Sequence, residues 1–196
     1  MREAELAMTR RVGASEENIL VVQSNLAIAY GELGRHEEAL SMERDVYFGR
    51  VKLHGEEDEE TLIAALNYSS SLVELRRLEE AKALLRKMIP VARRVLGDSN
   101  GITLRMRWVY ARALYEDPGA TLGDLREAVT TLEDTERTAR RVLSGAHPLV
   151  VDIGDEYRDA QAAFCACETL RPSLDAGRPS YNIPPWTMPL DDDYFI

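Results

Sequence analysis

Apolar residues recur every three or four positions along most of the chain, which is the spacing of amphipathic helices. One such stripe runs from Ile19 to Leu33, begins after the capping residue Ser15 and stops at Gly34. No segment shows the strict alternation of apolar and polar residues that is typical of strands. The pattern therefore predicts a chain built of helices.

The helical stripes come in copies. Gly13, Gly55 and Gly97 are spaced by 42 residues. The next step along the chain is 47, so five extra residues fall in the third unit, where Pro118 and Gly119 mark a turn. Each unit contains two helical stripes that cannot bury their apolar faces alone. The repeat predicts an all-α solenoid of about three to four stacked antiparallel helix hairpins.

The repeats also suggest how the chain is divided. A helical repeat domain is expected over residues 1–170, with units at about 13–54, 55–96, 97–143 and 144–170. Residues 1–12 look like the end of a preceding second helix. Residues 171–196 hold five prolines and are expected to form an irregular acidic and aromatic tail.

Composition narrows the function. The chain has 34 acidic and 24 basic residues, a net charge of −10 that disfavours nucleic acid as a partner. No apolar run is long enough to span a membrane, and the first residues do not form a secretory signal. Cys165 and Cys167 cannot make a disulfide framework, which favours a reducing, cytoplasmic location.

Candidate chemistry is sparse. Cys165 and Cys167 are two apart on a predicted helix, so they point in different directions and cannot hold one metal ion together. The three histidines fall near unit junctions, in different units. Paired glutamates begin helices, where they interact favourably with the helix dipole. We therefore expect neither a metal, nor a cofactor, nor catalysis, and an enzyme is the disfavoured alternative.

A family resemblance is carried by residues 25–40, which read Asn25-Leu-Ala-x-x-Tyr30-x-x-x-Gly34-Arg35-x-Glu37-Glu38-Ala39-Leu40. This run resembles the tetratricopeptide repeat. The 42-residue spacing and the junctions at Val95-Leu96-Gly97 and His147-Pro148 are similar to the kinesin light chain subtype. The resemblance covers about residues 1–168 and implies a non-catalytic scaffold that holds a peptide of a partner protein in a concave groove.

The resemblance also implies where that groove lies. The positions carried over are Val21, Ser24, Ile28 and Gly31 in the first unit, Ile63, Leu66, Ser70 and Val73 in the second, and Arg105, Trp108, Arg112 and Tyr115 in the third. Asn25 and Asn67 are expected at the groove edge, where they bond either a ligand backbone or a neighbouring helix. The Asn position of a carboxylate clamp falls on Ile28 and Ser70, so such a clamp is not expected.

The third unit suggests a ligand class. Guanidinium groups beside an indole suit an acidic peptide with an aromatic anchor, although Trp108 and Tyr115 are as readily core residues. The tail has matching chemistry, so it is a candidate to dock in its own groove through Trp186, Asp191, Asp192 and Asp193. The other alternative is a fragment or regulatory module of a larger array, which could self-associate through an uncapped N-terminal end.

Overall fold

A computed structural model describes residues 15–175, and every regular element in that part of the chain is a helix. The helices are α2 (Glu16–Glu32), α3 (His36–His54), α4 (Glu59–Glu74), α5 (Leu78–Val95), α6 (Gly101–Tyr115), α7 (Leu122–Val142) and α8 (Pro148–Asp175).

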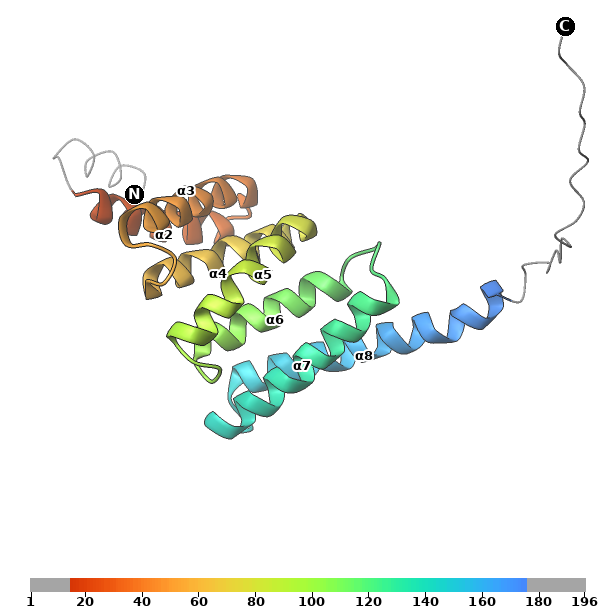
Figure 1. The fold of residues 1–196 in the computed structure, drawn as a ribbon. Coiled ribbons are helices and arrows are strands. Elements are labelled where there is room, and N and C mark those ends of the chain that lie inside the picture. The colour runs from red at the N-terminus through yellow and green to blue at the C-terminus, as the bar shows by residue number, and fades with distance from the viewer. Residues whose placement is uncertain (1–14, 176–196) are drawn as a thin grey trace, which may run out of the picture.

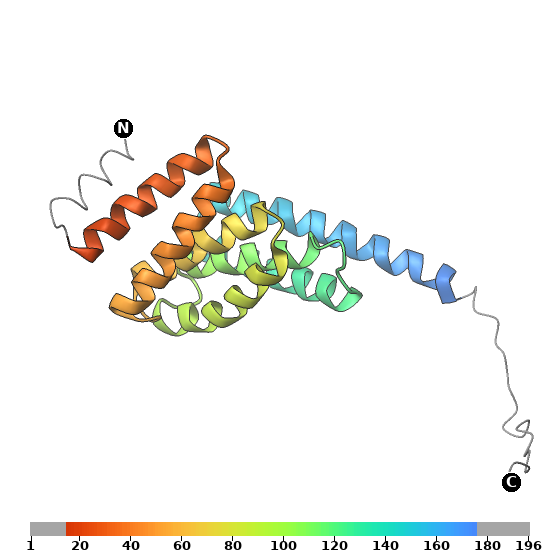
Figure 2. The same cartoon turned by 90° about the horizontal axis from the view of Figure 1, so that it is seen from above.

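The helices stack in chain order (Figure 1). Each packs on the next one along the chain, and first helices of successive units also touch, α4 against α6 and α6 against α8. The view from above shows the same layering, with the last turns of α8 extending past the other helices (Figure 2). The predicted all-α solenoid of helix hairpins is thus confirmed. Helix α8 runs five residues past the expected end at residue 170, through Pro172 to Asp175.

Helix starts follow the repeat. The side chains of Asp58 and Asn100, which are 42 residues apart, each accept a backbone N–H in the first turn of α4 and α6. His147, 47 residues further on, accepts the N–H of Leu149 with its Nδ1 at 3.2 Å. These side chains satisfy amide groups that a helix leaves without internal partners. The repeat spacing in the sequence is therefore the spacing of helix caps.

Second helices also begin alike. Arg35 donates from Nε and Nη2 to both carboxylate oxygens of Glu38, at 2.6 and 2.5 Å. Arg77 does the same to Glu80, at 2.7 and 2.8 Å. Each arginine precedes the first residue of its helix, α3 or α5, so the fork holds the turn against the first helical residues.

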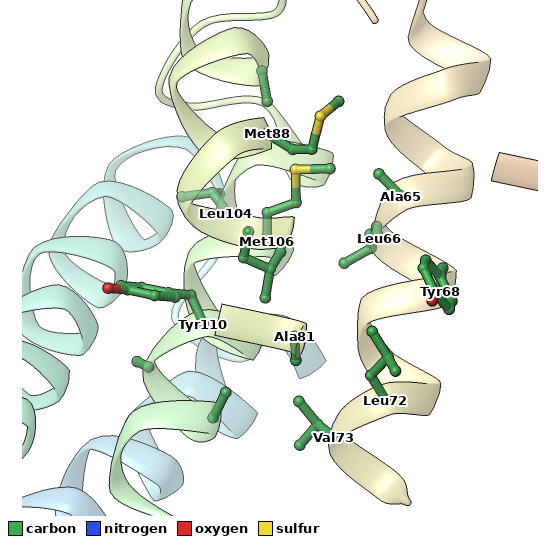
Figure 3. Close-up of a cluster of buried hydrophobic side chains, with 14 of the residues drawn as sticks. Ala65, Leu66, Tyr68, Leu72, Val73, Ala81, Met88, Leu104, Met106 and Tyr110 are labelled. Carbon is green, nitrogen blue, oxygen red and sulfur yellow. The ribbon is translucent and has the colours of Figure 1, made fainter. Parts of the chain in front are cut away.

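One apolar core runs through the stack, from Leu20 on α2 to Ala160 on α8. Its middle lies where α4 meets α5 and α6, with Leu72, Met88 and Met106 fully buried (Figure 3). A smaller cluster between α2 and α3 contains Leu26, Tyr30 and Ala39. Burial of this kind stabilises a solenoid by about 25 cal/mol per Å² of apolar surface removed from water.

Candidate functional site

A hollow of about 460 Å³ opens between α2, α3 and α4, and we call it the α2–α4 hollow. It lies where the first hairpin meets the first helix of the second. Its walls are mixed, with small and apolar side chains beside polar and acidic ones. The lining residues are Ala27, Ile28, Gly31, Glu32, His36, Ala39, Glu43, Asn67, Ser70, Ser71 and Glu74.

The hollow brings together positions that the sequence placed in the groove. Ile28 is 49% exposed and lines the hollow together with Asn67 and Ser70 of the next unit. Ser70 donates its hydroxyl to the carbonyl of Leu66 at 2.9 Å, so that proton is already used. Two further candidates, Ser24 and Asn25, lie on α2 outside the lining. The structure thus assembles one part of the expected set in one place.

Two expected groove residues belong to the core instead. Leu66 is 8% exposed and Val73 is 1% exposed, because α4 is packed on α3, α5 and α6 at once. Leu66 therefore offers almost no surface to a ligand, which corrects the sequence-based expectation. Ile63, one turn before Leu66, stays half-buried.

Glu43 is the lining residue that sequence reasoning missed. Its Oε2 is buried and has no hydrogen-bond partner among the described residues. Burial raises the pKa of this carboxyl to about 7, and the nearby charge of Glu74 adds to the rise, while the Ser71 hydroxyl opposes it. A signal was present, since Glu43 falls on the buried face of α3 with Ala39 four residues before it and Val46 three residues after it.

The charge of the hollow is acidic. Carboxyl groups line it from all three helices, namely Glu32 on α2, Glu43 on α3 and Glu74 on α4. The imidazole Nδ1 of His36 lies 3.9 Å from Glu74 Oε2. No Lys or Arg lines this hollow among the described residues.

The two arginines of the third unit, Arg105 and Arg112, differ in whether acidic groups of the chain pair with them. Arg112 donates from Nε to Glu116 at 2.6 Å and lies 3.9 Å from Glu156 on α8. Tyr115 donates its hydroxyl to the same Glu156. Arg105 is exposed and has no ion pair within the part of the chain that the structure describes. The structure therefore occupies Arg112 with acidic groups of its own and leaves Arg105 open to solvent.

The aromatic residues of that unit lean towards the core. Trp108 and Tyr115 are half-buried and pack against the main apolar cluster. The indole N–H of Trp108 is buried with no partner among residues 15–175. Burial raises the pKa of both Tyr115 and Glu156 above their ordinary values. Of the two alternatives for these aromatic side chains, the core interpretation gains from this packing.

The remaining candidates from the sequence are the tail residues, the two cysteines, and possible metal or membrane sites. Trp186, Asp191, Asp192 and Asp193, like residues 1–12, lie outside the described residues. Cys165 and Cys167 are free thiols. Within the described ranges no group of His, Cys, Asp and Glu is arranged to hold a metal ion. No described helix combines the length and apolar character needed to cross a membrane.

Comparison with known proteins adds to this geometry. The Tetratricopeptide repeat family model matches residues 19–60 and 61–100. Two crystal structures of nearly identical TPR-like repeats, from a Podosopora anserina protein that bears the name kinesin light chain, are 22% identical to the chain. Their TM-scores are 0.70 and 0.68, over 89% of this chain and 81% of theirs. BtubC (BKLC) from P. vanneervenii is 14% identical, with a TM-score of 0.59 over 93% and 73% of the two chains. No curated protein matches the sequence.

The stacked hairpins and the family match define the class: residues 19–100 are tetratricopeptide repeats, and the chain folds as a solenoid of that type. Repeats of this class generally serve as scaffolds for protein interactions. Within it, the solved structures assign the kinesin light chain type of fold, which confirms the resemblance seen in residues 25–40 and in the 42-residue spacing.

Proposed function

We propose that the chain is a non-catalytic scaffold that binds an extended segment of a partner protein along its first helices. The observation that carries the proposal is the α2–α4 hollow, which the exposed Ile28 of one repeat lines together with Asn67 and Ser70 of the next. An exposed apolar side chain beside free polar space is the surface that a bound peptide covers. Gly31, which lines the hollow and has open space where a Cβ would lie, lets a ligand backbone approach the helix closely.

The proposal is tested with a peptide selected on the intact chain. A random 12-residue display library is panned on the protein, and the affinity of recovered peptides is measured by calorimetry. Ile28→Arg fills the hollow and is expected to weaken binding at least tenfold. Val142→Arg is the matched control, because Val142 is 50% exposed at the far end of α7 and tolerates a cation there.

Circular dichroism melting of both variants shows whether each is folded. A control within about twofold of the wild type, together with a large loss for Ile28→Arg, supports the hollow as the binding surface. Failure to recover any peptide, or equal affinity of the two variants, overturns the proposal.

A more specific proposal concerns the ligand that the third unit binds. An acidic segment with an aromatic anchor would meet Arg105 first, because Arg112 is paired with Glu116 and Glu156. The C-terminal tail remains a candidate for that ligand through Trp186 and the aspartates that follow it. A role as a fragment or regulatory module of a larger array is the alternative proposal, and self-association would then use the N-terminal end of the chain. Action in the cytoplasm also stays a proposal.

A further inference from the structure

One carboxylate oxygen of Glu43 lacks a hydrogen-bond partner among the described residues. The Glu43 side chain lines the α2–α4 hollow, and the oxygen without a partner is the buried Oε2. The Ser71 hydroxyl interacts with this carboxyl, but a buried carboxylate oxygen without a partner still destabilises the folded chain. Oε2 itself is buried, but the Glu43 side chain lines a hollow large enough for a ligand group, so a rotation of the carboxyl lets a partner molecule supply the missing hydrogen bond.

We propose that the hollow receives the side chain of a lysine or arginine from the partner segment, and that Glu43 pairs with its charged head. This inference rests on the proposed function, since the segment must lie along the first helices. It adds the residue type at one position of that segment.

The charges around the hollow favour a cation. Glu32, Glu43 and Glu74 approach it from three different helices. The one basic group in the lining, His36, is already placed beside Glu74 at 3.9 Å. A carboxylate entering this space meets like charges, whereas an ammonium or guanidinium group is attracted by all three acids.

The walls suit the stem of such a side chain. Ile28 contributes exposed apolar surface next to the acidic groups, above the buried Ala27 and Ala39. Lysine and arginine carry three or four methylene groups below the charged head, and these pack on apolar surface while the head reaches a polar partner. A purely apolar side chain would leave the acidic groups without a partner, and an acidic side chain would be repelled by them.

The inference is tested on the peptides selected above. Each basic residue of a selected peptide is replaced in turn by norleucine, which keeps an aliphatic stem and removes the charge. Affinities are measured for the wild type, for Glu43→Gln, and for the control Glu37→Gln. Glu37 is exposed on the same helix and lies outside the hollow, so its variant removes an equal charge without touching the lining.

We expect one basic position whose replacement by norleucine weakens binding tenfold or more in the wild type and in Glu37→Gln. In Glu43→Gln the same replacement is expected to change affinity by less than about threefold, because the interaction is already lost. Glu43→Gln conserves the shape of the side chain, and its melting curve confirms that it is folded.

The outcomes separate the two claims. Peptides that lose affinity with Ile28→Arg but show no basic preference, or keep that preference in Glu43→Gln, overturn the inference and leave the proposed function standing. Failure to recover any peptide removes both. Dimerisation of the wild type that Glu43→Gln abolishes, seen by sedimentation, would make a second copy the occupant and overturn the assignment to a partner protein.

Discussion

Arg76 and Gly34 occupy the same position in consecutive repeats, 42 residues apart, and both adopt the left-handed backbone, with φ of 59° and 74°. Glycine enters this region freely, whereas a side chain with a Cβ is strained there by about 1–2 kcal/mol. Arg76 also lies 2.7 Å from the carboxylate of Glu116, although its own side chain is 65% exposed. The second repeat therefore keeps a strained residue at a turn where the first has glycine.

Arg76→Gly is expected to raise the free energy of unfolding by about 0.5–1 kcal/mol, because relief of strain exceeds the loss of an exposed ion pair. Gly34→Ala is expected to lower it by about 1 kcal/mol. Urea denaturation measures both. Arg76→Ala separates the two effects, since it removes the ion pair and keeps the strain; a gain in stability for that variant would contradict the argument.

A second prediction concerns the five-residue insertion. Lys82 on α5 is 7% exposed, and its Nζ lies 2.7 Å from Asp117 in the loop between α6 and α7. Asp117→Asn leaves this buried ammonium with the exposed Glu79 as its nearest acid, at 2.5 Å. We expect a loss of about 1–2 kcal/mol on urea denaturation at pH 7. Glu79→Gln is the control and is expected to change stability by less than about 0.5 kcal/mol.

The same pair predicts an acid dependence. The Lys82 ammonium holds the pKa of Asp117 below its usual value. The stability from this pair is therefore present above the pKa of an unfolded aspartate, about 4, and is lost as the pH falls through the lower folded value. The difference between wild type and Asp117→Asn should shrink below pH 4, and a constant difference would show that charge is not its cause.

Much of the fold was readable because repetition multiplies weak signals. Asp58 alone says little, because aspartate is a common helix-capping residue. Asn100 and His147 follow it at the repeat spacing, and together the three residues indicate that helix starts recur. Each unit must also bury its apolar stripes against a neighbour, so the order of stacking follows from the order of the chain. The periodicity of apolar residues and the rule that neighbouring units stack were enough to predict the fold.

The site was less readable because it depends on contacts between units. Glu43 falls on the buried face of its helix, but only the approach of α4 decides how much water it loses. The partner of Arg112, Glu156, is 44 residues further along the chain, and no local pattern links them. Gly49 gave no signal either, yet a Cβ there would lie 2.7 Å from Leu20, because α2 and α3 approach closely.

A third prediction follows from the raised pKa of Glu43. The folded chain holds this proton to about pH 7, whereas an unfolded glutamate releases it near 4.5. The folded state thus binds more protons between these values, and stability falls as the pH rises through that window. The titratable groups that line the hollow with Glu43 are Glu32 from α2, His36 from α3 and Glu74 from α4.

Glu43→Gln removes this titration. Relative to the wild type, the variant should be about 1–2 kcal/mol more stable at pH 8 and nearly equal at pH 4.5, with allowance for partial exposure of the carboxyl. Denaturation across that pH range measures the difference. Glu37→Gln should follow the wild type at every pH, and a Glu43→Gln curve parallel to the wild type would show that the carboxyl is well solvated.

The last prediction asks whether the third unit hides an anion site. Glu116 and Glu156 surround Arg112 and are only 17% and 19% exposed, so their charges are poorly screened. Replacing both by glutamine keeps an acceptor for the Tyr115 hydroxyl and removes the two charges that neutralise the guanidinium. Binding of a blocked peptide of residues 186–196, which carries Trp186 and three aspartates, should then strengthen about tenfold.

The matched control is Glu133→Gln with Asp134→Asn, which strips two acidic partners from Arg137 on α7 and changes the net charge equally. Fluorescence titration at about 0.05 and 0.5 M salt separates local pairing from the general field. If both double variants bind the peptide equally well, only net charge matters. If neither double variant binds the peptide more tightly than the wild type does, Arg112 is not a binding residue. Its guanidinium then has a structural role, which is to hold α6 against α8.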